Sequence, residues 1–104
     1  MTAAVPGASV VHHLPTDRFR PRAHVVWARQ AEATVLLDGE RGLYYTLNEV
    51  ASHLWELVVA GEPFMEIQRC LEEVYEVAAE TLYADVETVL KHLLDAGLIE
   101  RIPR

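Results

Sequence analysis

The spacing of hydrophobic residues along this chain changes at Asn48. Before Asn48, apolar and aromatic residues fill two short runs, over residues 34–38 and 43–47, on either side of the polar turn Asp-Gly-Glu-Arg-Gly. This pattern is typical of two antiparallel strands joined by a hairpin turn. After Asn48, apolar residues recur every three or four positions, which predicts helices. A strand with an open edge is therefore expected to lie beside helices.

Three strands are expected in the first half of the chain, over residues 24–30, 34–38 and 43–47. Gly39 and Gly42 lie in the turn between the last two strands, where glycine adopts a positive φ without steric cost. Alternation divides the side chains of the third strand between two faces. On one face lie Leu43, Tyr45 and Leu47, and on the other lie Tyr44 and Thr46. One of these faces is expected to join the core.

Three helices are expected after the strands, over residues 49–60, about 63–75 and about 81–96. Asn48 is a good N-cap for the first helix, because its side chain can accept a hydrogen bond from a free backbone N–H. Thr81 is placed to cap the third helix, and Gly97 is placed for a left-handed stop after it. Residues 98–102 are predicted to form a short strand or an extended arm. The expected fold class is α+β.

The third predicted helix carries an unusually wide apolar face. At 100° per residue its apolar side chains cover an arc of about 160°, wider than the roughly 100° that packing against one core requires. The arc consists of Leu82, Tyr83, Val86, Val89, Leu90, Leu93, Leu94 and Ala96. Two explanations stay open: part of the arc faces a groove, or the helix is buried on two sides.

The N-terminal part of the chain differs from the rest in composition and charge. Residues 1–22 contain three prolines and no sustained periodicity, which favours a flexible arm ahead of one domain over residues 23–104. Residues 1–31 have a net charge of +3, from four Arg and one Asp, whereas residues 32–104 have a net charge of −10. An acidic domain repels phosphate, so binding to nucleic acid is not expected.

The sequence also indicates the cellular location of the protein. No apolar run is long enough to span a bilayer, and the first residues lack the basic start and apolar stretch of a signal peptide. Cys70 is the one cysteine, so no disulfide can form within the chain. We therefore expect a cytoplasmic protein that does not bind membranes.

Residues with catalytic or metal-binding chemistry do not assemble into a recognisable motif. Cys70 falls on the apolar stripe of the second helix, where a buried, inert thiol is expected. The histidines at positions 12 and 13 fall in the predicted arm, and those at 24, 53 and 92 lack partners at metal-ligand spacing. The acidic pairs on the helices are typical of a solvated face. We expect no enzymatic activity, no cofactor and no metal.

Four motifs follow one another between residues 24 and 102. They are Leu37-Asp38, Gly42-Leu43-Tyr44-Tyr45-Thr46-Leu47-Asn48, Leu54-Trp55 and Ala96-Gly97-Leu98-Ile99. In this order and spacing they resemble the PqqD-like family. Members of that family are RiPP recognition elements, which bind the leader peptides of ribosomally made and modified peptides (RiPPs). The resemblance implies a winged helix-turn-helix, with a three-stranded antiparallel sheet followed by three helices.

The resemblance also implies a binding mechanism. In the family, the leader adds as an antiparallel strand to the open edge of the third strand, and its apolar side chains enter the cleft beside the third helix. The peptide-binding strand implied here is Leu43, Tyr44, Tyr45, Thr46 and Leu47. The implied wall of the cleft is Asp85, Val86, Val89, Leu90 and Leu93. This mechanism requires the edge at residues 43–47 to be free of other strands.

The chain ends a few residues after the predicted domain, so we expect a freestanding adaptor. The extended basic arm and the Tyr-Tyr strand resemble the leader-binding partner of split lasso-peptide proteases. That resemblance implies a separate leader peptidase, and possibly a cyclase, as partners. A peptide chaperone for another RiPP, such as pyrroloquinoline quinone, is the alternative within the family.

Two functions of other classes are also compatible with the predicted elements. A winged-helix transcription regulator shares the fold, but the third helix offers only Lys91 and His92 against Asp85, Glu87 and Asp95. This charge balance disfavours contact with DNA phosphates. A structural subunit that dimerises through the open strand edge is the other possibility. The expected oligomeric state is a monomer or a weak dimer.

Overall fold

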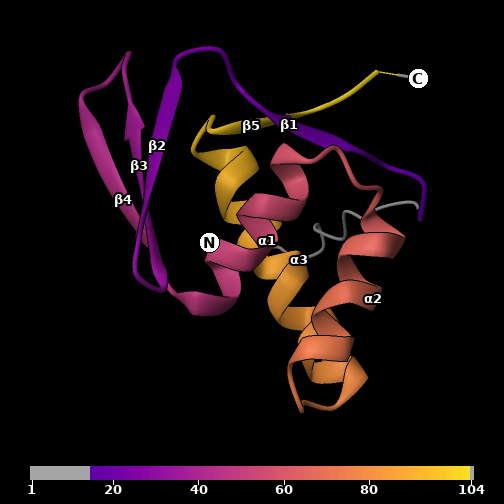
Figure 1. The fold of residues 1–104 in the computed structure, drawn as a ribbon. Coiled ribbons are helices and arrows are strands. Elements are labelled where there is room, and N and C mark those ends of the chain that lie inside the picture. Colours follow the sequence, from indigo (N-terminus) through magenta and orange to yellow (C-terminus); the bar gives the residue numbers. More distant parts are fainter. Residues whose placement is uncertain (1–14, 104) are drawn as a thin grey trace, which may run out of the picture.

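The computed structural model describes residues 15–103 as one sheet beside three helices, with a second, smaller sheet above them (Figure 1). The strands are β1 (Phe19–Pro21), β2 (Val25–Gln30), β3 (Ala33–Asp38), β4 (Leu43–Leu47) and β5 (Ile99–Arg101). The helices are α1 (Glu49–Val59), α2 (Phe64–Val74) and α3 (Ala79–Asp95). The predicted α+β class, with three antiparallel strands followed by three helices, is confirmed.

Strands β2, β3 and β4 form an antiparallel sheet in that order. In the turn between β3 and β4, Gly42 has φ +71°, as predicted, because glycine bears no Cβ to oppose this conformation. The prediction for Gly39 was wrong, since its φ is not positive. Gly39 is required for a different reason: a Cβ there would lie 2.9 Å from the carbonyl oxygen of His24. The backbone of the turn therefore approaches β2 too closely for a side chain.

The helix ends confirm two predicted signals and correct a third. The side chain of Asn48 accepts a hydrogen bond of 2.9 Å from the N–H of Ala51, and Gly97 has φ +73° just after α3. Thr81 does not cap α3, which begins two residues earlier and has no side-chain cap at Ala78. Ala and Glu are good helix formers, so the first turn extends back through residues 79 and 80.

The N-terminal boundary predicted from composition needs a correction. Residues 1–14 of the predicted arm lie outside the described residues. Within residues 15–22, β1 pairs antiparallel with β5, and the side chain of Phe19 is fully buried. The N–H of Phe64 also donates to the carbonyl of Asp17, at 2.8 Å. Residues 15–22 are thus part of the folded unit, through contacts with residues far away in the sequence.

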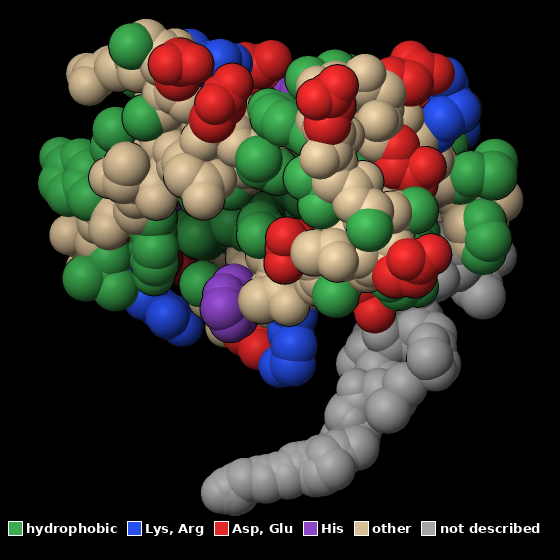
Figure 2. All heavy atoms as spheres, turned by 90° about the horizontal axis from the view of Figure 1, so that it is seen from below, with side chains coloured by type: hydrophobic (Ala, Val, Ile, Leu, Met, Phe, Trp, Pro, Cys, Tyr) green, Lys and Arg blue, Asp and Glu red, His purple; other side chains and the backbone are tan. Residues whose placement is uncertain are grey.

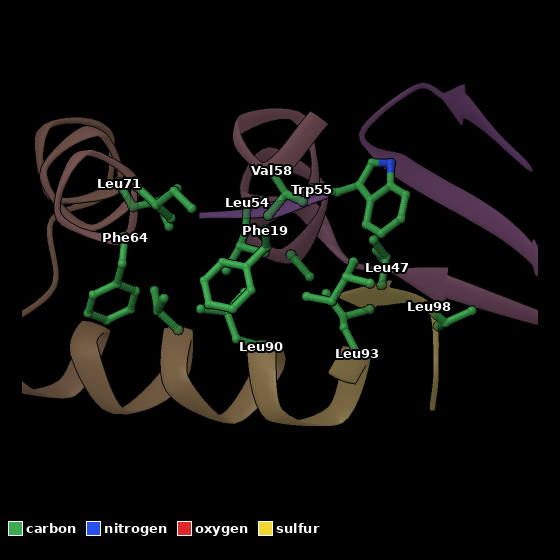
Figure 3. Packing of buried hydrophobic residues seen from close by; sticks show 14 of the residues in the cluster. Phe19, Leu47, Leu54, Trp55, Val58, Phe64, Leu71, Leu90, Leu93 and Leu98 are labelled. Atoms are coloured by element: carbon green, nitrogen blue, oxygen red, sulfur yellow. The ribbon is translucent and has the colours of Figure 1, made fainter. Parts of the chain in front are cut away.

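The core lies where α1 meets the sheet and the other two helices. Figure 3 shows Trp55 of α1 directed toward the sheet, while Leu90 and Leu93 of α3 point into the same cluster from below. Each fully buried side chain of this size contributes about 1.5–3 kcal/mol to the free energy of folding. Trp55 is 1% exposed, as its place on the apolar stripe predicts. The core therefore fixes α1 and α3 at a set position relative to the edge of the sheet.

Candidate functional site

Strand β4 is an edge strand. Among residues 15–103 it pairs with β3 on one side, and no described strand pairs with its other side. Strands β1 and β5, which lie outside the three-stranded sheet, pair with each other instead. The edge that was expected to be open is therefore open in the described part of the chain.

The register identifies which backbone groups of β4 point outward. The N–H of Gly39 donates to the carbonyl of His24, at 2.9 Å. The backbone N–H and C=O groups of every second residue of β3, counted back from Gly39, therefore point toward β2. The remaining residues of β3 then face β4, where their register partners are Leu43, Tyr45 and Leu47. The backbone N–H and C=O groups of Tyr44 and Thr46 consequently point away from the sheet. These groups are available to an added strand.

The side chains of β4 divide as the alternation predicts. Leu47 is 8% exposed and Tyr45 is half-buried against the core, on the face that looks toward α1. Leu43, on the same face, is 48% exposed, and Tyr44, on the opposite face, is 71% exposed. Thr46 is exposed as well. The burial of the inner face therefore increases along the strand toward Asn48.

A hollow lies between β4 and α3, and we refer to it as the β4 hollow. Its volume is about 400 Å³. Its lining residues are Tyr45, Thr46, Leu47, Asn48, Ala51, Val89, His92, Leu93, Ala96 and Leu98. None of them is an Asp, Glu, Lys or Arg. Figure 2 shows hydrophobic side chains at the bottom of a depression between the sheet and the helices.

A second hollow, the α1–α3 hollow, lies beyond the end of β4 and has a volume of about 360 Å³. Its lining residues are Asn48, Val50, Ala51, Leu54, Tyr75, Val77, Leu82, Asp85, Val86, Thr88 and Val89. Asn48, Ala51 and Val89 line both hollows. The two hollows thus meet where β4 passes into α1.

The structure brings together most, but not all, of the peptide-binding residues expected from the sequence. Val89 lines both hollows, Leu93 lines the β4 hollow, and Asp85 and Val86 line the other. Leu90 is fully buried in the core and lines neither hollow. Leu43 and Tyr44 line neither hollow, although they belong to the open edge. The wide apolar arc of α3 is thus partly core and partly cleft wall.

Several lining residues were not among the expected ones. On the β4 hollow these are Asn48, Ala51, His92, Ala96 and Leu98. Two of them, Ala96 and Leu98, belong to the closing motif that carries the family resemblance, so the sequence held a signal for them. Residues of α1 enter the cleft because Ser52, fully buried, donates a hydrogen bond of 3.1 Å to the carbonyl of Leu47. This bond fixes the start of α1 against the end of β4.

The turn that presents β4 is held by Asp38, which is 1% exposed. Its carboxylate accepts hydrogen bonds from the N–H groups of Glu40, at 2.9 Å, and Arg41, at 3.1 Å. His24 Nε2 lies 3.6 Å from the same oxygen. Burial raises the pKa of Asp38, but the two backbone donors and the nearby positive charges together lower it by more than burial raises it. The resulting pKa is below 3.8. The turn therefore carries an ionised carboxylate at neutral pH.

Tyr75 lines the α1–α3 hollow and lies near several charged side chains. At the α1–α3 hollow, burial raises the pKa of Tyr75, the charges of Glu49 and Glu32 raise it further, and Arg29 acts in the opposite direction. Arg29 is itself engaged in an ion pair with Glu56. The phenol of Tyr75 thus stays neutral in a negative local field.

The described residues contain no group of three or more His, Cys, Asp or Glu placed to hold a metal ion. Cys70 is half-buried on α2, and the histidines at 12 and 13 lie outside the described residues. No helix within residues 15–103 is both long and apolar enough to cross a bilayer. The chemistry offered by the site is that of a groove with backbone donors and acceptors along one edge.

Comparison with known families identifies the chain. The model of the family described as coenzyme PQQ synthesis protein D (PqqD) matches residues 33–99, which is more than half of the sequence. The chain belongs to the PqqD family. The PqqD-like RiPP recognition element predicted from the sequence motifs is thereby confirmed. A comparison with curated protein sequences gave no match.

Two solved structures are similar to this PqqD family member. One is described as TbiB1 in complex with the TbiA(beta) leader peptide; it is 30% identical, with a TM-score of 0.74, over 78% of this chain and 94% of that chain. The other is described as lasso peptide synthetase B1 complexed with the leader peptide; it is 27% identical, with a TM-score of 0.72, over 83% of this chain and 99% of that chain. Both similar proteins were solved with a leader peptide bound.

Proposed function

We propose that this PqqD family member is a non-catalytic adaptor of lasso peptide biosynthesis that binds the leader region of a ribosomal precursor peptide. The observation that carries the proposal is the open edge of β4 beside an apolar hollow. Family membership and the two similar structures with bound leaders support it. The family description alone would also fit a chaperone for pyrroloquinoline quinone, but the similarity to lasso peptide synthetase B1 favours the lasso class.

In the proposed complex the leader adds to β4 as an antiparallel strand. The outward N–H and C=O groups of Tyr44 and Thr46 hydrogen-bond to its backbone, which supplies affinity with little regard to sequence. Alternate leader side chains enter the β4 hollow, where Val89 and Leu93 select apolar groups. Expected contact residues are therefore the strand Leu43–Leu47 and the cleft wall on α3, with Leu90 supporting that wall from the core.

The proposed partners are a separate leader peptidase, which removes the bound leader, and a cyclase, which closes the ring. The adaptor would hold the precursor near these enzymes and raise its effective concentration there. We propose a cytoplasmic location, where precursors are synthesised, and a monomer or weak dimer. A DNA-binding role is not favoured, because Lys91 on α3 is bridged to Asp95 at 2.8 Å and the same helix carries Asp85 and Glu87.

Fluorescence anisotropy tests this function. The probe is a labelled synthetic peptide with the leader sequence of a candidate lasso precursor. Saturable binding is expected, together with slower hydrogen exchange at the amides of Tyr44 and Thr46, because those amides become hydrogen-bonded. An absence of binding at tens of micromolar peptide would contradict the proposal. Binding without protection of these two amides would place the leader elsewhere.

A further inference from the structure

The two hollows lie side by side along α3, and we refer to them together as the trough. They share the lining residues Asn48, Ala51 and Val89, so they lie next to each other. Only the β4 hollow borders residues of the strand edge. The α1–α3 hollow begins where the edge ends, at Asn48. A peptide that pairs with β4 and is longer than the strand therefore continues into the α1–α3 hollow.

The direction of the guest strand decides which of its ends arrives there. Strand β4 runs from Leu43 to Leu47 and then enters α1. An antiparallel guest runs the opposite way, so the residues that precede its paired segment lie past Leu47 and Asn48. The residues that follow the paired segment leave the trough near Leu43. The α1–α3 hollow consequently receives the N-terminal flank of the guest.

The lining of this hollow combines an apolar floor with an acidic rim. Val86 and Leu82 of α3 are buried, and Val50 of α1 is half-buried. Asp85 is exposed at the rim, and Glu49, also exposed, follows the lining residue Asn48 and acts electrostatically on Tyr75, which lines the hollow. A long aliphatic chain that ends in a positive charge matches such a surface, since its stem lies on the floor and its head reaches the carboxylates.

The positive groups around the hollow do not neutralise the negative charge of this rim. Arg29 is paired with Glu56 and also donates to the carbonyl of Ala31, at 3.0 Å. The N-terminus of α1 carries a partial positive charge, which Glu49 in its first turn offsets. His53 packs edge-on against Tyr75, with 6.0 Å between the ring centroids. The β4 hollow, by contrast, has no acidic lining residue.

We propose that the α1–α3 hollow recognises a Lys or Arg side chain in the leader residues that immediately precede the strand-forming segment. The inference rests on the proposed function and adds to it the direction of the bound leader and a preference for positive charge. The apolar segment is selected at the β4 hollow, and the basic residue ahead of it is selected at Asp85. A leader bound in reverse would bring its other flank to the same carboxylate.

Matched peptides test the inference. The strand-forming segment of the leader is extended at its N-terminus by two Lys, two Ala or two Glu, and a second set carries the same extensions at the C-terminus. Affinities are measured by anisotropy at low salt and in 0.5 M NaCl. The protein variants are Asp85→Asn and, as a control on the same helix outside both hollows, Asp95→Asn.

The N-terminal Lys peptide is expected to bind about threefold or more tightly than the Ala peptide at low salt, and the Glu peptide more weakly. High salt and Asp85→Asn should both remove the preference, and Asp95→Asn should retain it. Equal affinities for the three N-terminal extensions, or a preference shown only at the C-terminus, would overturn the inference while leaving leader binding in place. If none of the peptides binds, the proposed function fails together with the inference.

Discussion

The three-stranded sheet has two open edges in the described residues, β2 and β4, and they are not equivalent. On β2, side chains of the face toward α1 already have partners: Trp27 packs edge-on against Trp55, at 5.3 Å between ring centroids, and Arg29 is paired with Glu56. Beside β4 lies the β4 hollow, and the α1–α3 hollow lies past the end of the strand. Both edges offer backbone hydrogen bonds, and in the described part of the chain β4 also borders a hollow for a guest's side chains. An open edge becomes selective when the neighbouring space is left unfilled.

The difference between the edges follows from the placement of α3. Helix α3 stands across the β4 hollow from the strand, whereas α1 packs directly under the sheet through Trp55. A backbone hydrogen bond contributes only about 0.5–1.5 kcal/mol net, whatever the guest's sequence. Discrimination between guests must therefore come from the hollow. Variants at the two edges distinguish docking at β4 from docking at β2.

The largest expected effect follows from Thr46→Pro. Proline removes the outward N–H of Thr46 and is tolerated on an edge strand, so leader affinity should fall about tenfold or more while the fold persists. Anisotropy measures the affinity, and circular dichroism checks the fold. Thr46→Val keeps the N–H and should bind normally. Arg29→Pro makes the equivalent change on β2; an equal loss of affinity there would remove the distinction between the edges.

A charge in the cleft should weaken binding nearly as much. Val89 lines both hollows, and Val89→Asp would place a carboxylate where apolar leader side chains are expected, so affinity should fall about tenfold. Val74→Asp is the matched control, because Val74 is 56% exposed on α2 and lines neither hollow. Isothermal titration of both variants with the same leader gives the comparison. Unchanged affinity in Val89→Asp would mean that the cleft is not used.

Truncation on the other edge should affect stability and not binding. Trp27→Ala removes the ring that packs against Trp55, and because Trp27 is 44% exposed the free energy of unfolding should fall by about 2 kcal/mol, less than for a buried Trp. Urea titration measures this loss. Leader affinity should stay within about twofold of the original value. A large loss of affinity in a folded Trp27→Ala protein would indicate that β2 takes part in docking.

The smallest effect is expected in the turn that presents β4. The lowered pKa of Asp38 means that its carboxylate stabilises the fold above pH 3.8, and this contribution is lost as pH falls through the lower folded-state pKa. Asp38→Asn should therefore lower the melting temperature at pH 7, and the difference from the unaltered protein should shrink toward pH 3. Melting curves across that range provide the measurement. A difference independent of pH would exclude an ionic contribution.

Local signals account for what the sequence determined by itself. The period switch at Asn48, its cap on Ala51, the strand at residues 43–47 and the stop at Gly97 all appear where the sequence predicts them. Each depends on residues within a few positions of one another, so short-range sterics and hydrogen bonds suffice to specify it. The order of motifs that identifies the family is local in the same sense.

Other features were decided only by the tertiary structure, because they depend on residues far apart in the chain. Strand β1 forms because β5, some 80 positions later in the sequence, pairs with it. No pattern within residues 19–21 predicts that pairing. The requirement for Gly39 arises from the approach of His24. On α3, Leu90 and Val89 are equally apolar neighbours, yet one is fully buried and the other lines both hollows. A cleft is the space between packed elements, and that space exists only once α1, α3 and the sheet have taken their places.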